Sequence, residues 1–433
     1  MDRPERAAAQ PARQGLQLRH ACIVACIVAL GPMLLYYYHE FRIVDWPLEV
    51  SGYPVGRDFV NLWSGGRAAW SGDFATLFDA KKYAIDLQRH VHPSIVENGL
   101  VWSYPPTAFW IGLPFAGLPF YLALALWLLL GFAGVLWAFR LGKMQPLPWW
   151  PLPWLVLAPG VLMVLFFAQT ALVTSSLFIG GLVLARRRPW LAGALLAGFV
   201  VKPHMGLAIP VVLLALRHWR AFLATAVFTV VYVVVTVLAF GLEPWELYLG
   251  ITLPKHLAML TPWGFRLPWM FTAQYFPLLA SGLSAGVALH MHWLIAAAAL
   301  GMMAWALPRL RDGDLQLAAA AAATLLISPY MQAYELALPA LIALRIAAYA
   351  PAPGSDQYLT ARYSVAIISL LAPVIGLLTV LLLKINPVSA LMLANIALLV
   401  ATTQPSRAEL NRWRHAVSRW PLRLRRALNP SQA

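Results

Sequence analysis

The sequence predicts an all-α polytopic membrane protein, and three observations lead to this fold class. Hydrophobic residues fill 61% of the 433 positions, whereas charged residues fill only 11%. Apolar stretches recur along nearly the whole chain, separated by short segments that are rich in proline or basic residues. Ordinary soluble domains do not have this composition. We therefore expect a bundle of about twelve transmembrane helices.

The first span is expected at residues 20–38, behind a polar N-terminal segment, residues 1–19. That segment contains Arg3, Arg6, Arg13 and Arg19, and the positive-inside rule therefore places it in the cytoplasm. No small-residue cleavage pattern follows the span, so we interpret it as a retained anchor rather than a signal peptide.

Residues 39–118 are expected to form a long first extracytoplasmic loop. From Arg57 onward its apolar residues recur at helical spacing until Gly72, which predicts an amphipathic helix on the membrane surface. A second amphipathic helix is expected near residues 77–92. Residues 105–118 are apolar, but they are short and interrupted by prolines, which favours an interfacial or re-entrant piece over a full crossing.

The remaining spans complete a single transmembrane domain over residues 20–403, with a second large extracytoplasmic loop at 241–285 and a basic cytoplasmic tail at 404–433. We expect these spans at 119–139, 150–167, 170–185, 189–203, 204–216, 220–240, 286–307, 315–328, 335–349, 362–383 and 387–403.

The net charge of +15 reflects basic residues in short loops, and the positive-inside rule uses such residues to assign the orientation of the bundle. With the spans placed as above, the basic residues of the short loops all fall on the cytoplasmic side: Arg140, Lys143, Arg186, Arg187, Arg188, Arg217, Arg220, Arg309, Arg311 and Arg362. They form no strip of alternating basic and aromatic residues, so we expect membrane lipids and not nucleic acid as partners.

Polar residues from distant parts of the chain gather on the opposite, extracytoplasmic side. They are Arg57, Asp58, Gln169, Lys202, His204, Lys255, His256, Arg266, Tyr330 and Glu335. Ionisable groups near the ends of membrane spans are costly, so their convergence predicts a functional site. The structural alternatives are snorkelling for Lys202 and Glu335 and a salt bridge for Arg57.

A set of short motifs resembles glycosyltransferase family 87. They are DFVNLWSGGRAA (Asp58–Ala69), FD (Phe78, Asp79), YPP with a following LP (Tyr104–Pro106, Leu113–Pro114), KPH (Lys202–His204), RHWR (Arg217–Arg220) and SPYMQAYEL (Ser328–Leu336). The resemblance implies a GT-C fold and a membrane mannosyltransferase that takes its sugar from a polyprenyl-phosphate donor.

Three positions depart from the family pattern. Tyr330 stands where histidine is frequent, Glu335 where aspartate is common, and Ala168 where glycine usually precedes the glutamine. The motif in the first extracytoplasmic loop, Asp58–Ala69, shows no such departure. The resemblance therefore supports the general chemistry more strongly than the details of sugar recognition.

Sugar transfer from a lipid phosphate requires a base for the acceptor hydroxyl and positive charge for the departing phosphate. We expect Asp58 to be the base of an inverting reaction, because a single carboxylate is sufficient for one displacement. The predicted phosphate-binding residues are Lys202, His204, Arg266 and His256. The predicted sugar- or acceptor-binding residues are Arg57, Trp63, Arg67, Tyr104, Gln169, Tyr330 and Glu335.

No cofactor is expected, and no ligand spacing demands a metal ion, although a divalent metal is left open. The alternative function is a transporter or flippase of a lipid-linked sugar, which would have a similar number of broken helices. We find no convincing repeat between residues 1–216 and 217–433 in support of that alternative. The expected location is the inner membrane of a bacterial-type cell, with the active site on the extracytoplasmic face and a lipid or glycan as acceptor.

Overall fold

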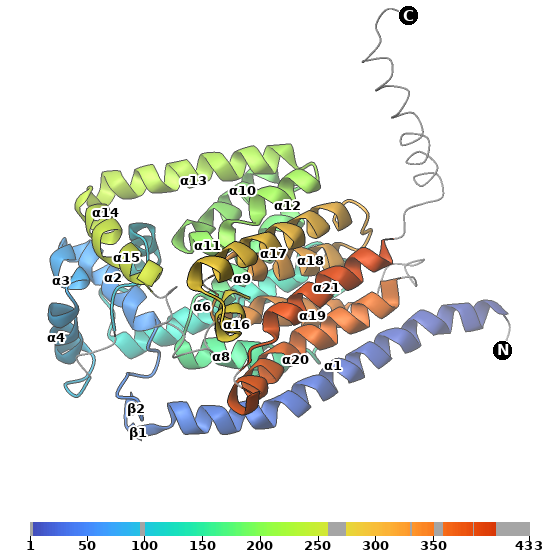
Figure 1. Cartoon of the computed structure of the whole chain (residues 1–433), viewed down its shortest axis with the longest axis horizontal. Helices are drawn as coiled ribbons and strands as arrows, with labels where there is room; N and C mark the ends of the chain where they lie inside the picture. Colours follow the sequence, from blue (N-terminus) through green and yellow to red (C-terminus); the bar gives the residue numbers. More distant parts are fainter. Residues whose placement is uncertain are drawn as a thin grey trace, which may run out of the picture.

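The protein is an all-α bundle with a small helical layer at one end (Figure 1). This computed structural model describes residues 3–95, 100–258, 274–329, 331–349, 358–383 and 385–403, with side chains from residue 15 onward. Within these residues the only strands are the short antiparallel pair β1 (Ile43–Asp45) and β2 (Leu48–Glu49). The predicted fold class is confirmed as a helical membrane protein.

Among the described residues, five helices are long and apolar enough to cross a membrane. They are α1 (Arg3–Phe41, with its apolar part at Gly15–Phe41), α6 (Phe120–Arg140), α13 (Trp219–Phe240), α17 (Ala285–Ala306) and α20 (Leu359–Leu383). A helix of about 20 residues rises about 30 Å, which is the thickness of the hydrocarbon core. All five coincide with predicted spans.

Shorter apolar helices occupy the other predicted ranges. They are α7 (Trp154–Leu157), α8 (Pro159–Phe167), α9 (Ala171–Leu184), α10 (Pro189–Ala197) with η3 (Gly198–Val201), α11 (Pro203–Gly206), α12 (Ile209–Ala215), α18 (Gly313–Ile327), η6 (Ala333–Leu336), α19 (Ala337–Ala348) and α21 (Val388–Thr402). Most are shorter than a straight crossing requires. The total of about twelve crossings therefore stays a prediction.

The first predicted loop folds into a helical layer that lies at one end of the bundle (Figure 1). It contains α2 (Phe59–Ser71), α3 (Phe74–Phe78), α4 (Ala80–His90), η1 (Pro106–Ala108), α5 (Phe109–Gly112) and η2 (Leu113–Phe115). Asp73 and Asp79 cap α3 and α4 by accepting backbone N–H bonds from Thr76 and from Lys81 and Lys82. The second predicted amphipathic helix is thus divided at Asp79.

The proline-rich segment packs directly on α2 through two glycines. A β-carbon placed on Gly112 would lie 1.8 Å from the Leu62 carbonyl oxygen, and one on Gly66 would lie 2.2 Å from the Gly112 carbonyl. Only glycine permits this approach of two backbones. Residues 105–118 are therefore short helices packed on α2 and do not form one long spanning helix, as expected.

A second close approach brings η6 to the first turn of α8. A β-carbon on Gly160 would lie 2.7 Å from the Leu336 carbonyl oxygen, so α8 and η6 are nearly in backbone contact. The first part of the second predicted loop contains α14 (Glu243–Leu247), the π-helical turn η4 (Tyr248–Thr252) and α15 (Leu253–Ala258). The middle and last thirds of the chain thus meet where α8 and η6 pack together.

Candidate active site

Asp58 lies immediately before α2, at the junction between the helical layer and α8. Its backbone N–H donates to the carbonyl of Phe167 over 3.0 Å, which fixes the start of α2 on the end of α8. The Asp58 side chain makes no capping bond to its own helix. Instead, its Oδ2 accepts a hydrogen bond of 3.0 Å from Nε2 of Gln169. The carboxylate is therefore directed toward another part of the chain.

Gln169 is held in one orientation by its neighbours. Its Oε1 accepts hydrogen bonds from Tyr104 Oη at 2.9 Å, from the Thr170 backbone N–H at 2.7 Å and from Thr170 Oγ1 at 3.0 Å. Because all three donors meet the same oxygen, the amide nitrogen has to face Asp58. Two predicted site residues, Tyr104 and Gln169, thus fix the position of a third.

A reversal of the chain at Ala168 makes this arrangement possible. Ala168 ends α8 in the left-handed conformation, with φ 51° and ψ 41°. Its carbonyl accepts from Trp127 Nε1 over 3.1 Å. Glycine adopts this conformation at lower cost than alanine does, which gives a physical reason for the glycine in the family pattern at this position.

Lys202 and Glu335 form a buried ion pair between η3 and η6. Lys202 Nζ donates to Glu335 Oε1 over 2.6 Å, and the two residues are 4% and 1% exposed. The Lys202 ammonium also lies 4.8 Å from the ring centroid of Tyr334. Glu335 Oε2 has no hydrogen-bond partner among the residues that the structure describes. The pair therefore retains an ammonium with unused N–H donors and an acceptor oxygen.

The charges of this pair act on Asp58. Burial raises the pKa of the Asp58 carboxyl from 3.8 to about 6. The positive charges of Arg57 and Lys202 and the Gln169 hydrogen bond oppose this rise, and the negative charge of Glu335 adds to it. Asp58, Gln169, Lys202 and Glu335 thus lie together although they come from four separate parts of the sequence. A carboxyl with a pKa near 6 is mostly ionised at neutral pH and can accept a proton.

Arg57 points away from this cluster, toward Glu49. The two side chains form an ion pair and a hydrogen bond. The guanidinium lies 4.5 Å from the ring centroid of Phe41 and 5.2 Å from that of Phe167. Burial raises the pKa of Glu49 to about 7, although the Arg57 charge opposes the rise. This geometry corresponds to the salt-bridge alternative for Arg57.

Trp63 and Arg67 lie on α2 away from Asp58. Trp63 is only 2% exposed, and its Nε1 donates to the Leu118 carbonyl over 3.1 Å. Arg67 covers the Trp63 ring at 4.8 Å and lies 3.9 Å from Asp86. Both residues contribute to the packing of the helical layer, and Trp63 has little free surface for a sugar.

The predicted histidines lie near Lys202. His204 begins α11 directly after the lysine, and the charges of Lys202 and His256 both act on it. His256 lies on α15, where burial lowers its pKa and favours the neutral imidazole. Arg266 and Tyr330 lie outside the described residues.

Sequence reasoning did not single out Glu49, Thr170 or Tyr334 as site residues. Tyr334 stood in the SPYMQAYEL motif next to Glu335, and Thr170 followed Gln169 directly, so both were adjacent to recognised positions. Glu49 had no such signal, because its role depends on the contact with Arg57. Among the described residues no group of three His, Cys, Asp or Glu side chains could hold a metal ion.

The sequence was compared with protein families, curated proteins and solved structures. The sequence model of glycosyltransferase family 87 matches residues 102–329, which is more than half of the chain. The match includes Tyr104, Gln169, Lys202 and His204 and leaves Asp58 and Glu335 outside its limits. No curated protein and no solved structure matches the chain at a significant level.

Proposed function

Because this chain belongs to glycosyltransferase family 87, we propose that it transfers a sugar from a polyprenyl-phosphate donor to a hydroxyl of a lipid or glycan acceptor. The proposed sugar is mannose, as the resemblance to polyprenyl-phosphate mannosyltransferases implies. The reaction takes place on the extracytoplasmic face, where a donor carried in the lipid is accessible.

The observation that carries this proposal is the position of Asp58. Its carboxylate accepts a hydrogen bond from Gln169, and the charges of Lys202 and Glu335 affect its pKa. A base, Asp58, and a cation, Lys202, from distant segments therefore lie close together. Inverting transfer needs these two groups, one to take the proton of the acceptor and one to stabilise the leaving phosphate.

In the proposed step the acceptor oxygen attacks the anomeric carbon from the face opposite the phosphate. Asp58 accepts the hydroxyl proton as the new C–O bond forms. The bond between the anomeric carbon and the phosphate oxygen breaks, and its electron pair stays on the phosphate. The products are an inverted glycoside, polyprenyl phosphate and a protonated Asp58, which then loses its proton to water.

Lys202 is proposed to bind the leaving phosphate and Glu335 a sugar hydroxyl. The lysine uses one N–H donor on Glu335 Oε1 and has others for phosphate oxygens. The second oxygen of Glu335 is free to accept from a hydroxyl, as far as the described residues show. His204, His256 and Arg266 are proposed as further phosphate ligands. Tyr330 is proposed as a sugar ligand, and Tyr104 and Gln169 position Asp58.

Membership in a glycosyltransferase family favours the enzyme over the transporter or flippase. The two functions also differ in their dependence on Asp58. A transferase needs a proton acceptor at the reacting hydroxyl, whereas the movement of a lipid-linked sugar across the membrane forms no glycosidic bond and does not need one.

The decisive experiment replaces Asp58 by asparagine, which keeps the size of the side chain and removes its basicity. Transfer of labelled sugar from polyprenyl-phosphate mannose to a membrane acceptor is expected to fall by about 100-fold or more, because general base catalysis contributes at least that much. The control is Asp45→Asn, which neutralises an exposed carboxylate on β1.

Both variants should be equally abundant and should give the same monodisperse elution profile in detergent. Activity of Asp58→Asn within about fivefold of wild type would remove Asp58 from the role of base. Mass spectrometry of lipid-linked sugars from cells with and without the gene would identify the donor, since the unused donor should accumulate in its absence.

A further inference from the structure

A large cavity lies at the opposite end of the bundle from Asp58. It has a volume of about 920 Å³ and lies among the segments that connect α6 to α7, α9 to α10, α12 to α13 and α17 to α18. Helix α13 separates the two ends, because Arg217 precedes it and Phe240 at its far end packs on Phe109 and Trp110 of the helical layer. We call this space the basic cavity.

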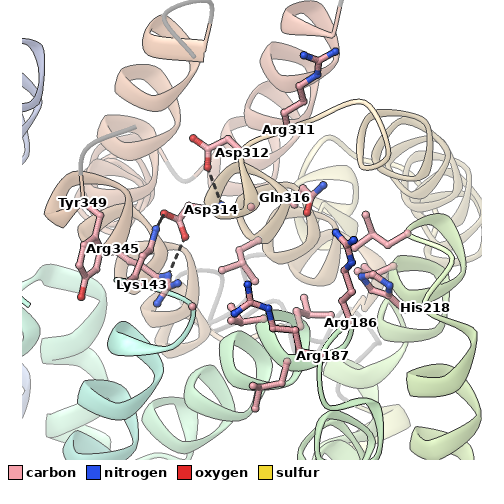
Figure 2. A pocket seen from close by; sticks show the side chains of 18 of the residues that line it. Lys143, Arg186, Arg187, His218, Arg311, Asp312, Asp314, Gln316, Arg345 and Tyr349 are labelled. Carbon is pink, nitrogen blue, oxygen red and sulfur yellow. Dashed lines mark hydrogen bonds and ion pairs between the residues drawn. The ribbon is translucent and has the colours of Figure 1, made fainter. Parts of the chain in front are cut away.

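Its lining is strongly positive. Among the described residues, seven Lys and Arg side chains and two Asp side chains line the basic cavity. Both carboxylates are already used: Asp314 pairs with Lys143 and Arg345, and Asp312 pairs with Arg362. Figure 2 shows Arg186, Arg187 and His218 on one side of the cavity, across from the Lys143, Asp314 and Arg345 network.

Four arginines therefore remain without a carboxylate. Arg186, Arg187, Arg217 and Arg311 line the cavity, and none of them forms an ion pair with any described residue. Like charges that line one space repel one another, and an anion bound beside them would reduce the repulsion. Guanidinium groups bind phosphate oxygens in a bidentate manner, so phosphate is the anion that suits this lining best.

The inner walls are apolar. Leu182, Val183, Val212, Leu216 and Leu317 line the same cavity as the arginines. A soluble anion gains nothing from such walls, whereas a lipid can place its glycerol and upper acyl region against them while its phosphate meets the arginines. Helices α6, α13, α17 and α20, which end or begin beside the cavity, are apolar enough to lie in the bilayer, so the head groups of one leaflet would lie at the level of the cavity.

From this combination we infer that the basic cavity is a binding site for the phosphate head group of an anionic diacyl phospholipid. The site is separate from the proposed donor site and does not depend on sugar transfer. Bound lipid would offset part of the positive charge of the four arginines and would contact loops of four helix pairs at this end of the bundle.

The test compares two triple variants of the full-length protein that lose the same charge in the same three loops. The cavity variant is Arg186→Gln/Arg217→Gln/Arg311→Gln. The control variant is Arg188→Gln/Arg220→Gln/Arg309→Gln, whose arginines lie within three residues of the first set and do not line the cavity. Binding of phosphatidylglycerol is measured by native mass spectrometry, with phosphatidylcholine as the reference lipid.

Wild type and control are expected to retain phosphatidylglycerol in preference to phosphatidylcholine. The cavity variant is expected to lose that preference, with affinity lower by on the order of 100-fold, since each basic residue contributes about a fivefold factor. An equal loss in both variants would show that only general surface charge matters, and it would overturn the site.

Two further arms separate the possible sources of the phosphate. Inorganic phosphate and polyprenyl phosphate are each added as competitors. Weak competition by inorganic phosphate at millimolar concentration supports a lipid site. Complete displacement by inorganic phosphate would instead assign the cavity to a free anion. Retention of polyprenyl phosphate without retention of phosphatidylglycerol would overturn the diacyl lipid as the ligand.

Discussion

At the scale of single residues, the candidate site depends on one residue in an unusual backbone conformation. Ala168 turns the chain at the end of α8, so that Gln169 faces Asp58 and the Ala168 carbonyl meets Trp127. The left-handed conformation costs an L-residue roughly 1 kcal/mol. The hydrogen bonds that Ala168 and Gln169 make with Trp127, Tyr104 and Asp58 offset this cost.

Replacement of Ala168 by glycine should therefore change stability little. Relief of the left-handed strain, about 1 kcal/mol, is offset by the lost burial of one methyl group, about 0.8 kcal/mol. Ala168→Val should destabilise the protein clearly, because a β-branched residue is strained at positive φ. Thermal unfolding in detergent measures both effects.

The matched control is Ala171→Gly, three residues later in the right-handed helix α9. Glycine gains no strain relief there, so this variant should lose about 1 to 2 kcal/mol. A larger loss for Ala168→Gly than for Ala171→Gly would contradict the interpretation of Ala168.

The pKa of Asp58 gives a second prediction at this scale. Burial raises this pKa to about 6, and the base is active only when ionised. Activity should therefore be constant above about pH 7 and fall as the pH drops through 6. Gln169→Leu should move the midpoint to higher pH, because the hydrogen bond to the ionised carboxylate is lost. A wild-type midpoint near 4 would show that Asp58 is not the titrating base.

At the scale of helices, two glycine contacts assemble the site. Gly112 brings α5 against α2, and Gly160 brings η6 against α8. The first contact fixes the helix that follows Asp58, and the second fixes the segment that carries Glu335. A side chain at either glycine would separate the elements that supply the base and the ion pair.

Gly112→Ala tests the first contact. The added methyl would lie 1.8 Å from the Leu62 carbonyl oxygen, so the two backbones have to move apart. Forcing an extra carbon into such a contact typically costs about 1 to 3 kcal/mol. We expect a lower melting temperature and a lower transfer rate.

Gly117→Ala is the control, because it lies in the same segment and a β-carbon there has no neighbour within 4 Å. It should behave like wild type. Equal melting temperatures for the two variants would show that the approach of α5 to α2 is not needed for stability.

At the scale of the whole molecule, the two ends of the bundle have different chemistry. One end carries Asp58, Gln169, Lys202 and Glu335, and the other carries the basic cavity. The basic residues that the sequence assigns to one side of the membrane include Lys143, Arg186, Arg217, Arg311 and Arg362, and all of these line that single cavity. The positive-inside rule then predicts that the cavity end is cytoplasmic.

Cysteine labelling tests this orientation. The native cysteines, Cys22 and Cys26, are buried and free, so they should react little. Lys81→Cys on the exposed surface of α4 should react with an impermeant maleimide from outside. Arg188→Cys should react only after the membrane is permeabilised. The reverse pattern would place the proposed active site in the cytoplasm.

Much of the helical framework was predictable, because the length and hydrophobicity of an apolar stretch are enough to predict a membrane-spanning helix. The division of residues 77–92 at Asp79 was not predicted, since a capping aspartate inside an amphipathic pattern is a weak local signal. Asp58, Gln169, Lys202 and Glu335 could all be selected as polar residues on one side of the membrane. Which of them pair could not be predicted, because the Asp58–Gln169 hydrogen bond and the Lys202–Glu335 ion pair join positions more than 100 residues apart.

Composition and the order of apolar and basic segments determine by themselves that this chain is a helical membrane protein. Apolar segments partition into the bilayer, and basic segments stay in water on its cytoplasmic side. Its motifs also indicate the family to which it belongs. Tertiary structure alone decided that Arg57 faces Glu49, that Trp63 is buried and that Asp58 meets Gln169 beside the Lys202–Glu335 pair. These contacts depend on how closely backbones approach at Gly66, Gly112 and Gly160, and such packing is a property of the assembled helices rather than of any one segment.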